Sequence, residues 1–187
     1  MAMVSTVLWR RLDQPGHDSA RLTEEATGPI IEGTALFNHS GQPCRLDYRV
    51  VCDPAWRTVT ARVVGWLGSS PIEVDVAVAA SREWTLNGRR DAEVHGCDDI
   101  DLSFSPASNL LPIRRLHPPT GASVEVRAAW LAFPELELQP LDQTYERLGE
   151  SEYRYTSHGG DFTAILETNP AGFVTYYPGL WRLERDR

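Results

Sequence analysis

The chain has 187 residues, 42% of them hydrophobic, which fits one domain with a single sizeable core. Its 18 basic and 26 acidic residues give a net charge of −8, which disfavours binding to nucleic acid or to anionic lipid headgroups. All the basic residues are arginine, so Schiff-base chemistry and a P-loop lysine are excluded.

Residues 1–16 contain no basic run followed by an apolar stretch, so we do not expect a secretory signal. The longest apolar runs fall far short of the roughly 20 residues that a membrane-spanning helix needs. We therefore expect a cytoplasmic protein without a transmembrane segment. Its cysteines are predicted to be buried, reduced thiols, because Cys44 and Cys52 would lie about 26 Å apart along one strand, too far for a disulfide.

Apolar and polar residues alternate along most of the chain, and this period of two predicts β-strands. In chain order, the predicted strands cover residues 6–12, 19–25, 29–37, 44–52, 58–67, 72–79, 124–130, 135–139, 143–148, 152–156, 161–168 and 172–177. Between them, the residues from Asp53 to Trp56 predict a turn, and Asn87-Gly88 predicts a tight hairpin.

One helical turn is predicted over residues 105–111, with Ser105 as its cap, Pro106 in its first position and Pro112 ending it. The remaining elements are about a dozen short strands, which favour an antiparallel sheet closed or rolled on itself. A flat sheet of that size would leave its edges exposed. The sequence therefore predicts a mainly β fold: one strongly curved, half-open sheet in a single domain, residues 1–187.

Some predicted strands carry charged or polar residues on one face. Arg45, Asp47 and Arg49 share a face of residues 44–52, and the set Thr58, Thr60, Arg62 and Trp66 shares a face of residues 58–67. These faces either line a polar lumen that holds a ligand or point to solvent. The six tryptophans leave a similar choice, because indole rings stack on sugars but also fill protein cores.

Two polar groups offer candidate chemistry. Asp99 and Asp101 would share one face of a strand, where paired carboxylates can act as acid and base, although such acidic runs are mostly solvated. Arg114 and Arg115, near Asn109, either bind a carboxylate, phosphate or vicinal hydroxyls, or tie a crossing segment to the sheet by salt bridges. The five scattered histidines have no zinc-ligand spacing, and no metal, cofactor or catalytic nucleophile is predicted.

Several stretches resemble motifs of one known family. Residues 101–116 look like the central motif of the bacterial putative glycolipid-binding family, and residues 48–57 and 128–136 resemble its first and third motifs. The closing residues 177–181 are similar to its carboxy-terminal signature. The resemblance covers nearly the whole chain. It implies a spiral β-roll around a cavity, related in shape to lipoprotein-localisation carriers, and the binding of a glycolipid or similar amphiphile.

We therefore expect a non-enzymatic protein that holds an amphiphile in the cleft of its rolled sheet. The residues expected to bind the ligand are Trp66, Trp84, Asp101, Ser103, Asn109, Arg114, Arg115, Tyr155, Tyr177 and Trp181. One alternative is an enzyme that acts on a sugar- or lipid-containing small molecule with Asp99 or Asp101 as acid or base. Another is a homodimeric scaffold whose tryptophans form the contact patch.

Overall fold

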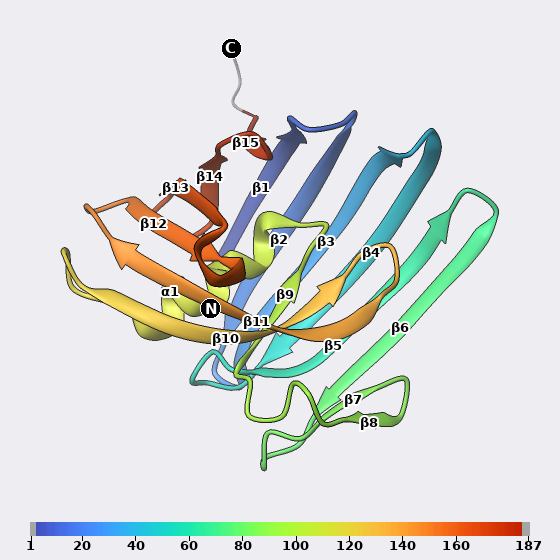
Figure 1. Cartoon of the computed structure of the whole chain (residues 1–187), viewed down its shortest axis with the longest axis horizontal. Coiled ribbons are helices and arrows are strands. Elements are labelled where there is room, and N and C mark those ends of the chain that lie inside the picture. The colour runs from blue at the N-terminus through green and yellow to red at the C-terminus, as the bar shows by residue number, and fades with distance from the viewer. Residues whose placement is uncertain (1–2, 185–187) are drawn as a thin grey trace.

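The structure is a computed structural model and describes residues 3–184 (Figure 1). Its strands are β1 (Met3–Arg11), β2 (Gly16–Glu25), β3 (Gly28–His39), β4 (Gln42–Cys52), β5 (Thr58–Leu67), β6 (Ser70–Val78), β7 (Trp84–Leu86), β8 (Arg89–Asp91), β9 (Asp99–Leu102), β10 (Ser123–Ala132), β11 (Glu137–Arg147), β12 (Glu152–Ser157), β13 (Phe162–Thr168), β14 (Val174–Tyr177) and β15 (Trp181–Leu183). Its helical segments are η1 (Pro106–Asn109), α1 (Leu110–Leu116) and η2 (His158–Gly160), where η denotes a 3-10 helix.

These 15 strands form one sheet, in the order β8-β7-β6-β5-β4-β3-β2-β1-β15-β14-β13-β12-β11-β10-β9. Strands that follow one another in the chain are neighbours in the sheet, except β8 and β9, which form its two edges. The two halves of the sheet join where β1 pairs with β15. The long strands β1–β6 form one wall, the first wall, and β10–β13 curve round to face it as part of a second wall (Figure 1). The prediction of a mainly β fold with one strongly curved, unclosed sheet is confirmed.

The sheet departs from the predicted antiparallel pairing at one place, because β9 pairs with β10 in parallel. Between them the chain crosses through η1 and α1, and this long connection returns it in the same direction. The β9 edge is also attached to the opposite wall. Thr58 of β5 donates a backbone hydrogen bond to Asp98 over 2.9 Å, and its Oγ1 accepts one from the amide of Ile100 over 3.0 Å.

Thr58 reaches β9 because β5 contains a bulge. Cys52 pairs with Thr58 but Val51 pairs with Thr60, so Val59 is the extra residue. The predicted alternation was therefore wrong at this end of the strand: Thr58 is buried on the inner face and Val59 is exposed.

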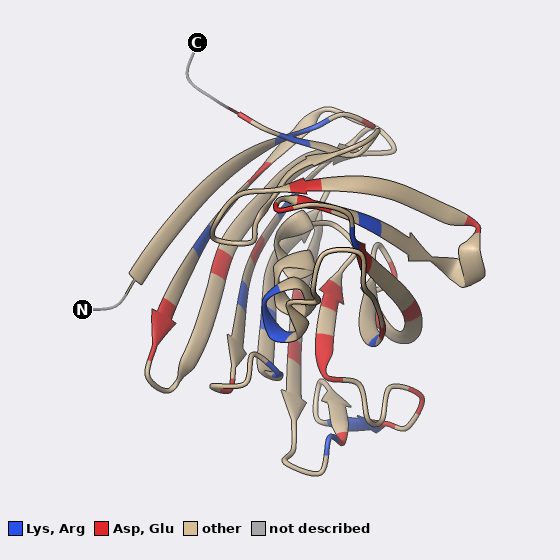
Figure 2. Ribbon diagram, turned by 90° about the vertical axis from the view of Figure 1, so that its left-hand side faces the viewer, with Lys and Arg blue, Asp and Glu red and all other residues tan. Residues whose placement is uncertain are grey.

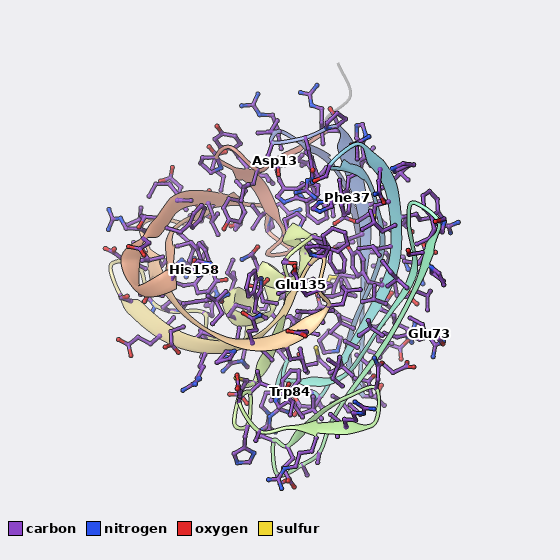
Figure 3. The ribbon with its side chains drawn as sticks, turned by 45° about the vertical axis from the view of Figure 1, so that its right-hand side comes forward. Asp13, Phe37, Glu73, Trp84, Glu135 and His158 are labelled. Atoms are coloured by element: carbon purple, nitrogen blue, oxygen red, sulfur yellow. The ribbon has the colours of Figure 1, made fainter. Side chains whose placement is uncertain are left out.

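The charged rows predicted on β4 and β5 point to solvent. Arg45 pairs with Asp47 over 2.8 Å, and Arg62 pairs with Asp75 over 2.9 Å, all on the outer face. Figure 3 shows Phe37 toward the inside of the curved sheet and Glu73 on its outside. The solvent-face interpretation of these rows is thus the correct one.

The helical segments η1 and α1, which we call the crossing segment, lie between the walls and fill the concave side of the sheet (Figure 2). Apolar residues of η1 and α1, including Leu110 and Leu111, are completely buried there. Pro112 does not end this helix as predicted. It lies in the first turn of α1, where a backbone N–H has no partner within the helix, so proline is tolerated. The helix instead ends at His117, which adopts a left-handed conformation.

Residues 135–139 and 143–148 were predicted as two strands, but β11 runs through both without a break. Pro140 lies in the middle of this strand, opposite Ala129 of β10. On the other side of β11, the pairing with β12 begins only at Gln143, so no strand lies beside Pro140 there. The N–H that proline lacks is therefore not needed for a hydrogen bond to a strand on that side.

The three cysteines are free and buried, as predicted. No helix among the described residues is both long and apolar enough to cross a membrane.

Candidate functional site

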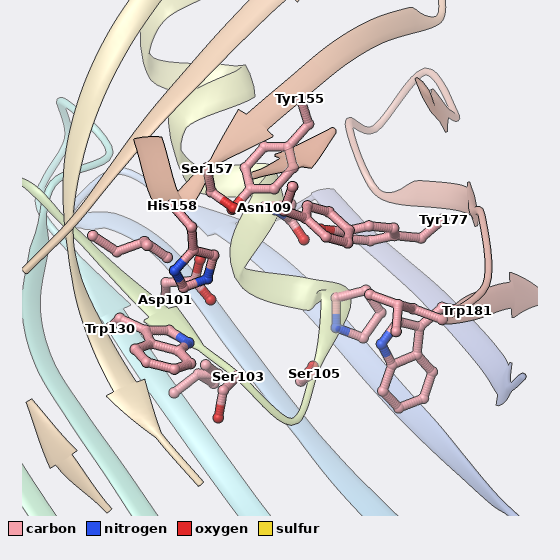
Figure 4. A pocket seen from close by; sticks show the side chains of 15 residues that line it. Asp101, Ser103, Ser105, Asn109, Trp130, Tyr155, Ser157, His158, Tyr177 and Trp181 are labelled. Atoms are coloured by element: carbon pink, nitrogen blue, oxygen red, sulfur yellow. The ribbon is translucent and has the colours of Figure 1, made fainter. Parts of the chain in front are cut away.

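A pocket of about 170 Å³, which we call the inner pocket, lies between η1 and the strands of the second wall (Figure 4). Six of the ten predicted ligand-binding residues line it: Asp101, Ser103, Asn109, Tyr155, Tyr177 and Trp181. They come from β9 and the segment after it, η1, β12, β14 and the start of β15. His158 is exposed, so the pocket reaches solvent beside this residue.

Asp101 is held at the pocket wall by a chain of polar side chains. The Nε2 of Gln143 donates a hydrogen bond to Oδ2 of Asp101, and the hydroxyl of Tyr145 donates to Oε1 of Gln143 over 3.4 Å. The Nδ2 of Asn109 in turn donates to the Tyr145 hydroxyl over 3.0 Å. Burial raises the pKa of Asp101 to about 6, although the hydrogen bond from Gln143 opposes this shift. Asp101 is therefore mostly ionised above that pH.

Aromatic rings form much of the remaining wall. The rings of Tyr155, Phe162 and Tyr177 pack against one another at tilted or edge-to-face angles, with centroids 6.0–6.1 Å apart. Trp130 packs edge-on against His158, with centroids 5.8 Å apart. Burial raises the pKa of both tyrosine hydroxyls, which therefore stay protonated at neutral pH. The wall thus offers ring faces and hydroxyl groups to a ligand.

Behind the pocket lies a buried polar cluster. Ser105, which lines the pocket, donates a hydrogen bond to Asp18 of β2, and the hydroxyl of Tyr48 donates to the same carboxylate over 3.1 Å. Ser105 also caps η1, because its Oγ accepts a hydrogen bond from the amide of Ala107 over 3.1 Å. Burial raises the pKa of Asp18 to about 7. The cluster anchors the crossing segment to the first wall.

Two predicted tryptophans lie outside the inner pocket. Trp66 is 36% exposed on the outer face of β5, the face that carries the charged rows. Trp84 is fully buried, and its indole N–H donates to the backbone oxygen of Cys97 over 3.0 Å. Trp84 therefore fills the core, which is the alternative that the sequence left open for such residues.

The predicted arginine pair also lies outside this pocket. Arg114 donates to the carboxylate of Glu24 over 2.9 Å and to the backbone oxygen of Ala171 over 3.0 Å. Arg115 holds the carboxylate of Asp99 with two of its nitrogens. These contacts match the structural alternative, in which the arginines tie the crossing segment to the sheet.

The two carboxylates of the predicted acid–base pair do not meet in the pocket. Asp99 is 1% exposed and bound to Arg115, and it does not line the inner pocket, whereas Asp101 does. Among the described residues, no cluster of three histidines, cysteines or acids has the geometry to hold a metal ion.

Sequence reasoning missed the other residues that line the pocket: Leu102, Ser105, Pro106, Trp130, Leu141, Ser157, His158, Phe162 and Leu180. Four of them, Trp130, Leu141, Ser157 and Phe162, lie on β10–β13, strands whose inner faces look like ordinary core in the sequence. The one available signal was the resemblance itself. Leu102, Ser105 and Pro106 fall within its central motif, and Trp130 and Leu180 fall within its third and last motifs.

The volume of the pocket limits what it can hold. A cavity of about 150 Å³ accommodates one benzene ring, whereas sites for drug-sized ligands measure about 300–1,000 Å³. At about 170 Å³, the inner pocket has room for one six-membered ring. The cleft is thus smaller than the roomy cavity that the resemblance implies, because η1 and α1 occupy the centre of the roll.

Comparisons with known proteins agree with this architecture. The model of a family described as "Putative glycolipid-binding" matches residues 6–183. The chain is also similar to the crystal structure of a DUF1089 family protein from Pseudomonas aeruginosa. That similarity has a TM-score of 0.73 and 29% sequence identity, and it covers 96% of this chain and 91% of the other. A comparison with curated proteins gave no match. Because the family model spans almost the whole sequence, the chain belongs to the putative glycolipid-binding family.

Proposed function

We propose that the protein binds an amphiphile, such as a glycolipid, with the ring of its head group in the inner pocket. The observation that carries this proposal is the make-up of the wall, where indole and phenol rings alternate with hydroxyl, amide and carboxylate groups. Sugar rings present apolar faces and a rim of hydroxyls, and such a wall complements both. The family membership supports the same ligand class.

The size of the pocket divides the ligand into two parts. One ring fills the volume, so the acyl chain of a glycolipid would leave the pocket. The side chains of Leu141, Phe162 and Leu180 line the pocket and would contact the first methylenes of that chain. Each methylene removed from water contributes about 0.8 kcal/mol.

The proposal can be tested with octyl glucoside, which combines a single sugar ring with a short chain. We expect octyl glucoside below its micelle concentration to quench or shift the tryptophan fluorescence of the protein in a saturable way. Trp130→Ala should weaken this binding at least tenfold, because it removes a ring face from the pocket. Trp66→Ala, which removes an indole from the outer face, serves as the matched control and should leave binding unchanged.

Native mass spectrometry of freshly purified protein gives a second, independent measurement. We expect a bound amphiphile, or one acquired on incubation with a lipid mixture. An absence of binding in both experiments would contradict the proposal. Equal losses of binding in Trp130→Ala and Trp66→Ala would contradict the choice of pocket.

The two alternative functions have less support. Acid–base chemistry on a glycoside needs two carboxylates about 5–10 Å apart, and among the described residues the inner pocket is lined by one, Asp101. A contact patch of tryptophans needs several exposed indoles. All six tryptophans are described, and three of them, Trp9, Trp84 and Trp181, are buried.

A further inference from the structure

The charged side chains of the inner pocket are unevenly distributed. Among the described residues that line it, Asp101 is the one carboxylate, and no arginine is present, although the chain contains 18 arginines. An anionic head group needs arginines or helix N-termini in contact with its oxygens. The N-terminus of η1 does line the pocket, but Pro106 has no N–H and the amide of Ala107 already donates to Ser105. The lining therefore offers neither an arginine nor these N–H groups to phosphate, sulfate or carboxylate.

The aromatic rings of the lining also favour a cation over an anion. Figure 4 shows Trp130 and Trp181 on two sides of the pocket, with Tyr155 and Tyr177 along a third. The face of an aromatic ring carries partial negative charge and attracts organic cations, most strongly when the cation is shielded from water. A cage of aromatic faces with one carboxylate is the arrangement by which proteins hold ammonium groups.

We propose that the inner pocket selects a head group that carries an ammonium group, with Asp101 as its counter-ion, over neutral and anionic head groups of the same size. This inference rests on the proposed function, because it specifies the ligand class of that same pocket. The ammonium could belong to an amino sugar or to a choline-type head. Both place a positive charge on a group of about the size that the pocket holds.

The other charged groups near the pocket do not provide an anion site. The guanidinium of Arg11 lies over the rings of Trp181 and Phe37, with centroid distances of 4.8 and 4.7 Å. Arg11 also pairs with Asp13 over 2.8 Å and does not line the pocket. Arg11 thus already covers part of Trp181, and its charge is balanced by Asp13. His158 is the remaining titratable side chain at the rim, and we include it in the test below.

The test compares four probes that share an octyl chain and differ in the head group. They are octyl glucoside, the corresponding octyl 2-amino-2-deoxyglucoside, octyltrimethylammonium and octyl sulfate. Dissociation constants are measured by calorimetry at pH 7.5, below micelle concentrations. A salt concentration of about 0.15 M limits the Debye length to about 8 Å, so the net charge of the chain contributes little.

We expect the amino sugar probe to bind at least tenfold more tightly than octyl glucoside, and octyl sulfate to bind at least tenfold more weakly. Asp101→Asn keeps an oxygen for Gln143 and should fold. It should reduce the preference for the amino sugar over octyl glucoside to less than threefold, whatever its effect on the affinity for octyl glucoside itself. Asp161→Asn removes the same charge from an exposed position three residues beyond His158 and should keep the preference. His158→Gln should also keep it.

The outcomes separate this inference from the proposed function. If octyl glucoside binds and no cationic probe binds more tightly, or if octyl sulfate is preferred, the ammonium inference is wrong and the proposed function stands. A preference that survives Asp101→Asn also overturns the inference, because it would not depend on the counter-ion. If none of the four probes binds, the proposed function itself fails. Tighter binding of octyltrimethylammonium than of the amino sugar identifies a choline-type head, and the reverse order identifies an amino sugar.

Discussion

The hydroxyl of Ser105 donates a hydrogen bond to the carboxylate of Asp18, which joins the segment before η1 to strand β2 on the first wall. Asp18 is fully buried, and its other side-chain partner is the hydroxyl of Tyr48. The carboxylate is therefore held by neutral donors. Since its ionised form must stay in a dry site, burial raises its pKa to about 7. This cluster connects the crossing segment, and with it the inner pocket, to the opposite wall.

The stability of the protein should consequently fall as the pH rises from 4 to 7. The folded pKa of Asp18 lies above its unfolded value of 3.8, so the folded state binds the proton more tightly. The stabilisation from this tighter proton binding is complete below pH 3.8 and is lost as the pH passes 7. The free energy of unfolding changes by about 4 kcal/mol over this range. Asp101, with a pKa raised to about 6, acts in the same direction.

Urea unfolding of the native protein and of Asp18→Asn between pH 4 and pH 8 checks this prediction. The variant cannot ionise at position 18, so its free energy of unfolding should vary less with pH. Parallel curves for the two proteins would show that Asp18 does not titrate in this range.

Gly33 provides the space that Tyr48 needs to reach Asp18. A Cβ atom on Gly33 would lie 2.3 Å from the phenol ring of Tyr48, a distance that no relaxed structure tolerates. Gly33→Ala should therefore displace the ring and its hydroxyl, and we expect destabilisation of about 1–3 kcal/mol. Gly149→Ala is the control, because its nearest neighbour would lie 3.6 Å away. Thermal or urea unfolding measures both, and equal effects would refute the role of Gly33.

The ion pair between Arg115 and Asp99 should be worth far more than the surface pairs. Asp99 is 1% exposed, so Arg115→Met leaves a buried charge without its partner, which costs about 3–5 kcal/mol. Arg62→Met removes an arginine that is 54% exposed and should cost less than about 1 kcal/mol. Asp99→Asn added to Arg115→Met should recover part of the loss. A double-mutant cycle by urea unfolding measures this coupling, and a coupling near zero would contradict the assignment.

Much of the fold could be predicted from the sequence because sheet faces alternate with a period of two. The pattern Cys44, Leu46, Tyr48, Val50 and Cys52 is buried throughout, and Asn87-Gly88 forms the turn between β7 and β8 as expected. The pattern failed where an irregularity shifts the period, as at the bulge of Val59 in β5. A bulge moves one strand relative to its partner, and a single sequence carries little sign of that.

The site was less predictable because its contacts are long-range. Arg114 looked like a ligand-binding group, yet its partner Glu24 lies 90 residues away in sequence and only the folded chain brings them together. His158 and Trp130 meet in the same manner. Motif residues could be identified from the sequence, but their assignment to the pocket, the core or an ion pair depends on how β9–β15 curl over the crossing segment.

Trp84 and Trp66 give the sharpest check on that assignment, since both were expected in the ligand site and neither lines the inner pocket. Trp84 is fully buried with its indole N–H bonded to Cys97, so Trp84→Phe should cost about 2 kcal/mol through lost packing and a lost hydrogen bond. Trp66→Phe on the outer face should change stability by less than about 0.5 kcal/mol. Urea midpoints measure both costs.

Octyl glucoside titrations of the folded variants should show unchanged affinity, because neither ring touches the pocket. If Trp66→Phe abolished binding while the protein remained folded, the ligand would bind on the outer face of β5, and the inner pocket would not be the binding site.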